Sequence, residues 1–306
     1  MNVELPVINS EIEKNHAGFI RSVNDAYLDQ LTQIAGDIAE HRNERPIVLL
    51  SGPSGSGKTT TALMIEKILD ENGVETHTLS MDNYFCPLSE EEKRLFSEGK
   101  LDLESPSRVD SAFLTSQLAA IGACEPVELP RYDFEKSARA SSGKIFRRKP
   151  GELVILEGIH ALNPDVIALP DESTAKVYVS VRTRITDGDI TLHPSKIRLM
   201  RRLVRDKNFR RRSFEDTLMM FRSVEEGENK YIMPYKYRST YDVDTFMAYE
   251  VSAYRGFLLD ELSQIDGAAD IADAVTVLSD AVPLSAEKIT PDSLICEFIG
   301  TGQFIY

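Results

Sequence analysis

PIVLLSGPSGSGKT, residues 46–59, sets the architecture of this chain. Its first six residues form a short apolar run, which suits a central parallel strand that is covered on both faces. The next eight, Gly52 to Thr59, match the pattern G-x-x-x-x-G-K-[ST] completely. In such a loop the glycines let the main chain curl so that its N–H groups face phosphate oxygens. We therefore predict a phosphate-binding loop between a buried strand and a helix that begins near Lys58.

The loop also predicts its ligand. A lysine at position 58 supplies a mobile cation for the β- and γ-phosphates of a nucleotide, and the Thr59 hydroxyl is an oxygen ligand of the kind that Mg²⁺ prefers. A chance glycine- and serine-rich turn would not explain this full match in the right context. The predicted nucleotide-binding residues are Gly52, Ser54, Gly55, Ser56, Gly57, Lys58, Thr59 and Thr60.

Strands and helices alternate along the rest of the chain. Apolar runs predict strands at about 46–51, 75–80, 152–156 and 176–181, with an edge strand at about 242–246. Helical periodicity predicts helices at about 10–41, 58–70, 110–121, 195–206, 214–231 and 248–265. The remainder of 86–150 looks polar and irregular. This order predicts an α/β fold, a three-layer sandwich with a parallel sheet and helices on both faces.

Three parts are expected. They are a helical extension over 1–45, the α/β domain over 46–266 and a tail over 267–306 that packs on the core. The tail ends in an apolar stretch, 295–306.

Composition excludes several classes of function. The formal net charge of −14 argues against a general nucleic-acid binder, and it makes any anion site a local basic island. The three cysteines are widely separated, which favours reduced thiols over a disulfide framework or a zinc site. With no long apolar run and no signal-peptide pattern at the start, we expect a cytoplasmic protein without a membrane span.

Two carboxylates follow predicted strands. Asp82 comes after the strand at 75–80 and Glu157 ends the strand at 152–156, so both are expected at the carboxyl edge of the sheet, where open α/β sheets bind ligands. Asp82 suits the deprotonation of an attacking hydroxyl, and both suit a metal site. The alternatives are a turn-forming Asp-Asn pair for Asp82 and an ordinary strand-end carboxylate for Glu157.

Residues 196–212 form a basic island, KIRLMRRLVRDKNFRRR. Arg198, Arg201, Arg202 and Arg205 fall on one face of the predicted helix. Such a face favours a lid whose arginines close over phosphates and stabilise charge in a transition state. A solvated basic face and an RNA-contacting patch are the alternatives.

Taken together, the motifs resemble the uridine kinase branch of the phosphoribulokinase/uridine kinase family, in family order over about 46–246. The matching pieces are GPSGSGKTT (52–60), LSMDNYF (79–85), SPSRVDSAFL (105–114), LPRYDF (129–134), VILEGIHAL (154–162), the arginines of 201–212 and NKYIMPYKYRSTYDVD (229–244).

The resemblance implies a role for each site residue. Asp82 resembles the catalytic base, with Lys58, Arg202 and Arg205 as its catalytic partners. Thr59, Asp82 and Glu157 resemble metal-site residues for Mg²⁺. The acceptor-side residues implied are Asp82, Tyr84, Tyr132, Phe134, Arg210 and Arg212, and the alternative for Tyr132 and Phe134 is an aromatic pair packed in the core.

The chain also departs from the pattern. Where uridine–cytidine kinases carry a histidine that reads the pyrimidine edge, this chain has Ser137. At position 160 it has a histidine where the family has an apolar residue. His160 either faces the pocket or caps the turn after the strand. The flanks, including PLSAEKITPDSLICEFIG (283–300), resemble a longer bacterial group that joins a TGS domain to a uridine-kinase-like domain.

The resemblance implies an ATP-dependent kinase for the 5′-hydroxyl of a nucleoside. A kinase for another small alcohol, such as a sugar phosphate or a pantothenate-like acid, is the first alternative. A nucleotide-binding regulator without turnover is the second. A homo-oligomer is compatible with each of these three functions.

Overall fold

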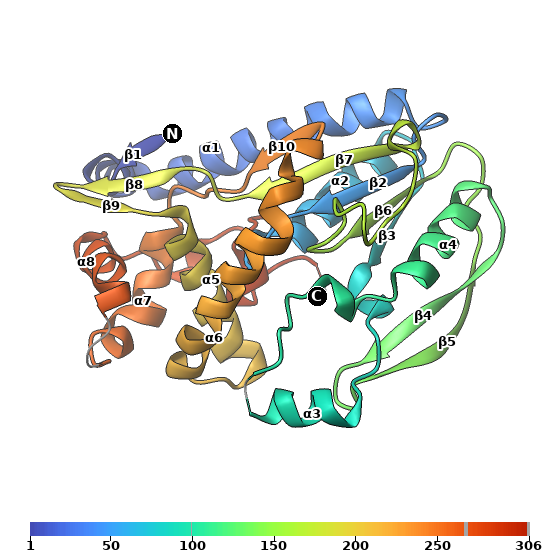
Figure 1. The fold of residues 1–306 in the computed structure, drawn as a ribbon. Coiled ribbons are helices and arrows are strands. Elements are labelled where there is room, and N and C mark those ends of the chain that lie inside the picture. The colour runs from blue at the N-terminus through green and yellow to red at the C-terminus, as the bar shows by residue number, and fades with distance from the viewer. Residues whose placement is uncertain (99, 266–268, 305–306) are drawn as a thin grey trace.

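A computed structural model describes residues 1–98, 100–265 and 269–304. Its centre is a sheet of five parallel strands in the order β10-β7-β2-β6-β3 (Figure 1). The strands are β2 (Ile47–Ser51), β3 (Thr76–Ser80), β6 (Leu153–Glu157), β7 (Thr174–Ser180) and β10 (Tyr241–Asp244). The predicted parallel sheet is confirmed, and the strand that leads into the phosphate loop lies in the middle of it.

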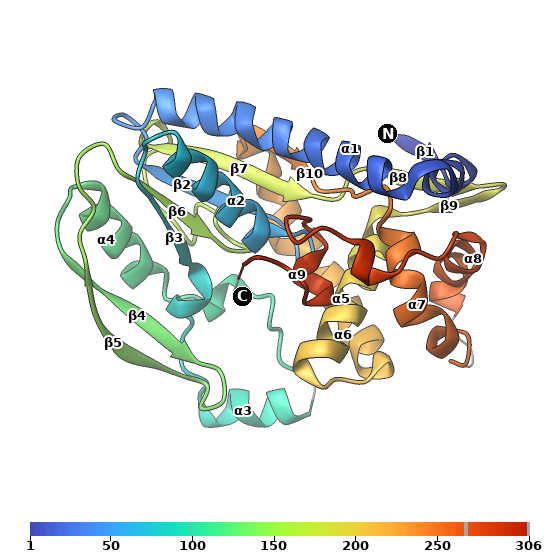
Figure 2. The same cartoon turned by 180° about the vertical axis from the view of Figure 1, so that it is seen from behind.

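Strand β2 explains why the sequence there is apolar without alternation. Val48 and Leu50 belong to the core beneath α1 (Leu5–Glu40) and α2 (Lys58–Glu71). Ile47 and Leu49 belong to a second core with α4 (Ser111–Gly122). Because both faces of the strand are covered, every residue along it gains from being apolar. The helices on the two faces make the outer layers of the sandwich (Figures 1 and 2).

Most of the remaining helices gather beyond one end of the sheet (Figure 1). They are α5 (Pro194–Arg210), α6 (Phe214–Gly227), α7 (Glu250–Leu262), α8 (Ala272–Asp280) and α9 (Cys296–Ile299). Helix α5 runs four residues past the predicted end at 206, and α6 ends at Gly227 instead of 231. After Gly227 the chain continues in a wider and then a tighter helical turn as far as Arg238.

The N-terminal segment is built into the core. Helix α1 starts at Leu5 and is broken at Asn15, whose Oδ1 accepts a hydrogen bond from the Gly18 N–H. Before it, β1 (Asn2–Glu4) pairs in parallel with β8 (Arg184–Asp187), which pairs with β9 (Ile190–Leu192). Apolar side chains along α1, such as Leu31, are fully buried. The first 45 residues therefore share the core of the rest of the chain.

The segment from 86 to 150 is more regular than predicted. Besides α4 it holds α3 (Glu90–Ser97) and an antiparallel hairpin, β4 (Val127–Asp133) and β5 (Ala138–Phe146). The irregular reading was wrong for these elements because most of β5 is exposed, so its sequence lacks apolar alternation. The hairpin turn also lacks the glycine by which such turns are recognised in a sequence, since Ser137 takes the positive φ of 49°.

The predicted tail packs against the core through α8 and α9, whose inward side chains are buried. The predicted boundary at 266/267 and the last two residues of the apolar stretch 295–306 lie outside the described residues. Within the described part of the chain, no helix combines the length and the apolar character that crossing a bilayer requires.

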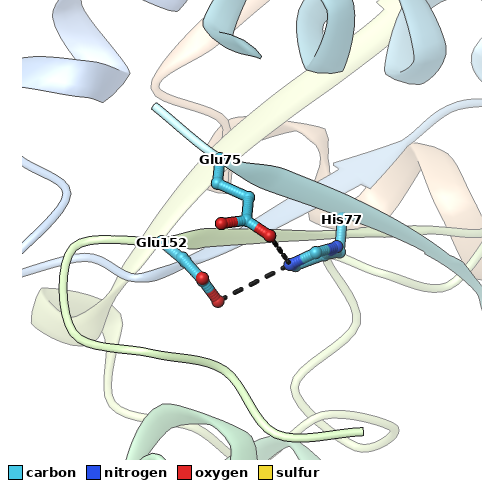
Figure 3. A group of neighbouring side chains, drawn as sticks. All are labelled: Glu75, His77 and Glu152. Atoms are coloured by element: carbon cyan, nitrogen blue, oxygen red, sulfur yellow. Dashed lines mark ion pairs between the residues drawn. The ribbon is translucent and has the colours of Figure 1, made fainter. Parts of the chain in front are cut away.

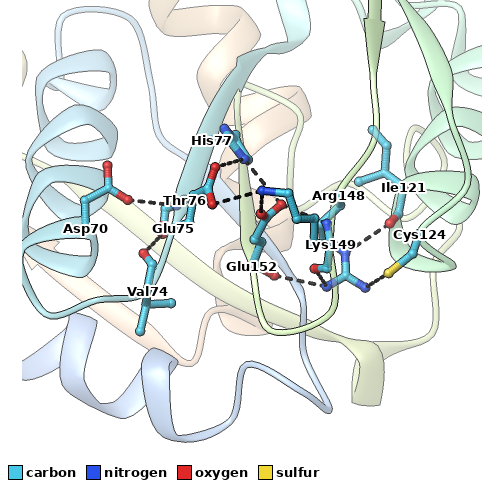
Figure 4. A network of polar contacts seen from close by, with 10 residues as sticks. All are labelled: Asp70, Val74, Glu75, Thr76, His77, Ile121, Cys124, Arg148, Lys149 and Glu152. Atoms are coloured by element: carbon cyan, nitrogen blue, oxygen red, sulfur yellow. Dashed lines mark hydrogen bonds and ion pairs between the residues drawn. The ribbon is translucent and has the colours of Figure 1, made fainter.

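A polar network ties the amino ends of β3 and β6 together, at the end of the sheet away from the phosphate loop. Nε2 of His77 lies 3.8 Å from Glu75 Oε1 and 3.6 Å from Glu152 Oε2, and the three side chains point toward one another (Figure 3). Lys149 Nζ lies 3.2 Å from Glu75 Oε2 and 2.8 Å from Glu152 Oε1 (Figure 4). Because this ammonium pairs with both carboxylates, we interpret the group as an ion-pair network that joins the two strands.

Candidate active site

The phosphate loop has the backbone that its glycines predict. Gly55 and Gly57 have φ values of 75° and 85°, which disfavour any residue with a Cβ atom. At Gly52 a Cβ atom would lie 2.0 Å from the carbonyl oxygen of Val179, so only glycine lets the loop pack against β7. These three positions hold the loop curled at the end of β2.

The loop opens into a cavity of about 660 Å³. Lys58 of the loop and Asp82 beyond β3 line the same cavity. The other predicted site residues on its wall are Ser54, Gly55, Gly57, Thr59, Tyr132, Phe134, Glu157, Arg202, Arg205, Arg210 and Arg212. Gly52, Ser56 and Thr60 are buried behind these residues in the loop. One concave site thus collects side chains from the turn after β3, from β6, from the β4–β5 hairpin and from α2 and α5.

Loss of hydration raises the pKa of both strand-end carboxyl groups. Glu157 is 8% exposed, and its removal from water raises its pKa to about 7, although Lys58 opposes the shift. The Ser80 hydroxyl donates to Glu157 Oε1 at 3.0 Å. Asp82 is open to the cavity, yet the surrounding protein raises its pKa as well, against the opposing pull of Lys58 and Arg210. Both carboxyls therefore hold a proton more firmly than free carboxyls do.

Oxygen donors for a metal are present together. Thr59, Asp82 and Glu157 all line the cavity beside Lys58. A hydroxyl and two carboxylates form the donor set that suits Mg²⁺, so these residues fit the predicted metal.

Glu104 is a third carboxylate that the sequence analysis missed. Its side chain lines the cavity, and burial raises its pKa while Arg202 and Lys58 lower it. It packs against Gly227 of α6, where a Cβ atom would lie 2.4 Å from Glu104 Cβ. Its Oε2 is buried without a hydrogen-bond partner in the described structure. In the sequence, Glu104 is the first residue of ESPSR (104–108). No pattern there distinguishes this residue from an ordinary surface glutamate.

Four arginines of the cavity share one acidic partner. Asp206 of α5 is fully buried. Ion pairs join it to Arg202 at 3.7 Å, Arg205 at 3.2 Å, Arg210 at 3.3 Å and Arg212 at 3.0 Å. Since one carboxylate cannot neutralise four guanidinium groups, this cluster keeps a strong positive potential that suits a polyphosphate. Arg202 also donates to the Ser54 hydroxyl at 2.8 Å and so ties α5 to the loop.

The predicted basic face is not a single lid surface. Arg201 is fully buried and makes a two-point ion pair with Glu250, with Nε to Oε2 at 2.7 Å and Nη2 to Oε1 at 3.0 Å. Arg198 is buried in an ion pair with Glu228. The prediction that all four arginines of 198–205 face the ligand was wrong for these two, because acidic partners from α7 and from the turn after α6 draw them into the core.

Aromatic rings also line the cavity. Tyr132 and Phe134 of the hairpin meet edge to face with centroids 5.1 Å apart, and Phe85 lies 5.7 Å from Tyr132. Phe134 is 64% exposed, so the alternative of a pair packed in the core does not hold for it. Three aromatic side chains therefore form a wall against which a flat group could pack.

Tyr84 is not beside this wall. Its side chain is buried in the core with α4, and its hydroxyl donates to Gln117 Oε1 at 2.9 Å. Burial raises the pKa of Tyr84 to about 12. The adjacent Phe85 lines the cavity in its place.

The two positions that depart from the family pattern differ in placement. Ser137 lines the cavity beside the aromatic wall. His160 is buried with its ring edge-on to Tyr231, and burial lowers its pKa to about 4, so it stays neutral. It does not line the cavity wall.

The phosphoribulokinase/uridine kinase family model matches residues 47–251, which is more than half of the chain. The chain belongs to this family. The uridine kinase of Lactobacillus helveticus is 34% identical over 201 residues, which cover 63% of this chain and 83% of the relative. The uridine kinase of Listeria innocua is 33% identical over 199 residues, with coverages of 63% and 84%.

Among solved structures, a Silicibacter sp. protein described as a fructose transport system kinase shares the fold. It has a TM-score of 0.54 at 17% identity and covers 69% of this chain and 98% of its own. The family membership makes this protein a transferase, a nucleotide-binding P-loop kinase.

Proposed function

We propose that this kinase transfers the γ-phosphoryl group of ATP to the 5′-hydroxyl of a nucleoside. The observation that carries the proposal is the composition of one cavity. Lys58 and Asp82 are among its lining residues, and so are the aromatic rings of Phe85, Tyr132 and Phe134. A polyphosphate fits the first group, while the flat base of a nucleoside fits the second.

Each group has a chemical task in this proposal. The loop N–H groups and Lys58 hold the β- and γ-phosphates. Asp82 accepts the proton of the acceptor hydroxyl as that oxygen attacks the γ-phosphorus in line with the leaving oxygen. Arg202 and Arg205 neutralise the charge on the group in transfer. Mg²⁺, held by Thr59, Asp82 and Glu157, would offset phosphate charge when bound.

A second acceptor class is supported by Ser137. A serine hydroxyl reaches less far than an imidazole, so the hairpin turn is a poor reader of a pyrimidine edge. A different small alcohol, such as a sugar phosphate or a pantothenate-like acid, would then occupy the aromatic end.

The test is ADP release measured with a panel of acceptors: uridine, cytidine, purine nucleosides, ribulose 5-phosphate and pantothenate. We expect a pyrimidine nucleoside to stimulate ADP release most. Stimulation by a sugar phosphate or pantothenate alone would instead select the second class. If no acceptor raises ADP release above the background hydrolysis, the kinase proposal for this cavity is wrong.

Two variants test the assigned chemistry. Lys58→Ala and Asp82→Asn should each lower kcat by at least about a hundredfold, because one removes phosphate stabilisation and the other removes the base. Thermal unfolding should change little in both. Near-normal turnover of Asp82→Asn would exclude that residue as the base.

A further inference from the structure

The C-terminal segment reaches into the phosphate loop. Leu294 packs against Gly57, where a Cβ atom would lie 2.9 Å from Leu294 Cδ1. Three residues later, Glu297 of α9 lines the active-site cavity. Figure 2 shows α9 between the loop end of α2 and helix α5. A carboxylate from the far end of the chain therefore stands at the nucleotide site.

Glu297 engages two hydrogen-bond donors of the loop helix. Its Oε2 accepts from the Thr60 hydroxyl at 2.6 Å and lies 3.4 Å from the Thr60 main-chain nitrogen, which donates to it. Thr60 is in the first turn of α2, whose N–H groups have no partner within the helix. Such N–H groups after the glycine-rich loop are the ones that receive nucleotide phosphates. The carboxylate thus takes a position that suits a phosphate oxygen.

The segment itself is firmly anchored. Ile295, Cys296 and Phe298 are fully buried. The guanidinium of Arg201 lies 5.3 Å from the centroid of the Phe298 ring. Glu297 in contrast is half-buried, at the cavity wall. The carboxylate can therefore leave Thr60 by rotation of its own side chain while the backbone of α9 stays in place.

We propose that Glu297 is a built-in competitor of the nucleotide and sets the affinity of the phosphate loop for it. The α-phosphate must displace this carboxylate from Thr60 and then tolerate a like charge close by, so the resident carboxylate weakens nucleotide binding. The inference rests on the proposed function in that it takes an adenine nucleotide as the ligand. It adds a residue outside the matched family region, 47–251, to the determinants of nucleotide affinity.

The test is calorimetric titration of Mg²⁺–ADP, and of a non-hydrolysable ATP analogue, into wild-type protein and the Glu297→Gln variant. The amide keeps an oxygen that accepts from Thr60 but removes the negative charge. We expect about tenfold tighter binding in the variant, because a like-charge contact in a partly enclosed site is lost. Equal or weaker binding by a folded Glu297→Gln variant would overturn the proposal.

Three further variants make the result specific. Glu287→Gln removes the same charge from an exposed position in the same C-terminal region and should leave the affinity unchanged. Glu297→Ala is the second variant if the amide does not fold, and it should also bind more tightly. Lys58→Ala should lose binding. In turnover assays Glu297→Gln should lower the KM for ATP with little change in kcat, whereas a purely structural role would lower the melting temperature and weaken binding.

The two proposals fail in different ways. If Glu297→Gln binds nucleotide more tightly but no acceptor is phosphorylated, the proposed function is wrong and the role of Glu297 stands. If acceptors are phosphorylated and Glu297→Gln binds nucleotide no more tightly than the wild type, only the competitor role is wrong. If neither protein binds nucleotide, both are wrong.

Discussion

Single residues in the cavity differ in how far the fold has changed their chemistry. Glu157 is the clearest case, because its pKa rises from 4.5 to about 7 on burial. Ser80 and Lys58 both favour its charged form, and the loss of hydration still outweighs them. A carboxylate kept in this state is ready to bind a cation, since a cation would restore the stabilisation that water supplied.

The raised pKa of Glu157 predicts that the free energy of unfolding depends on pH. Between pH 4.5 and about 7 the folded protein holds a proton that the unfolded chain has released, so the free energy of unfolding falls as pH rises. Glu157→Gln removes this titration. In metal-free protein the variant should gain stability relative to the wild type across that window, by up to about 3 kcal/mol above pH 7.

Urea denaturation at pH 5 and pH 8, without Mg²⁺ or nucleotide, measures this difference. Glu287→Gln, at an exposed position, is the control for the loss of a carboxylate. An equal difference between Glu157→Gln and the wild type at both pH values would refute the assigned pKa.

Helix α5 shows how one element serves two purposes. Arg201 on its inner side fixes the helix to α7 through Glu250, while Arg202 and Arg205 line the cavity. Neither member of the inner pair is exposed to solvent. Such a pair adds little net stability compared with apolar residues, but the loss of one partner leaves a buried charge unpaired.

Arg201→Met should therefore destabilise the protein by about 3–5 kcal/mol, because Glu250 would be left charged in the core. Adding Glu250→Leu should recover most of that loss. Arg205→Met is the matched comparison on the same helix: it should cost about 1 kcal/mol or less in stability, since Asp206 keeps three other arginines, yet lower kcat. Chemical denaturation and turnover together measure both effects, and similar losses of stability in the two single variants would contradict this division.

At the scale of the whole molecule, the N-terminal helix α1 and the C-terminal segment both pack on the α/β domain that carries the phosphate loop. Helix α1 packs on α2, where the Tyr27 hydroxyl lies 2.7 Å from the Thr61 hydroxyl. Asn24 of the same helix bonds to Thr290 at 3.0 Å and to Tyr249. Helix α1 and the C-terminal segment thus contact each other beside α2 and are part of one core.

Leu31→Ala tests whether the N-terminal segment is integral. This side chain is fully buried, so the loss of its contacts and the cavity left behind should cost about 2–5 kcal/mol of global stability. Leu28→Ala on the same helix is the control, because Leu28 is 40% exposed and should cost far less. If Leu31→Ala melts only a local segment and leaves the main transition unchanged, then α1 is an appendage.

The sequence by itself determined the phosphate loop, the five parallel strands and the carboxylates Asp82 and Glu157 at their ends. These features follow from local rules. An apolar run must be covered, glycines permit one tight curl, and the carboxyl ends of parallel strands share one edge. For the same reason the hairpin β4–β5 was missed, since most of β5 is exposed and carries no such pattern.

Only the tertiary structure decided which arginines line the cavity, and that Glu104 and Glu297 line it as well. Arg201 and Arg202 are adjacent in the sequence and have the same side chain. Arg201 pairs with Glu250 in the core, whereas Arg202 bonds to Ser54 of the phosphate loop. Glu297 meets Thr60 across 237 residues of sequence. A contact over such a separation depends on how the whole core closes, so no spacing in the sequence encodes it.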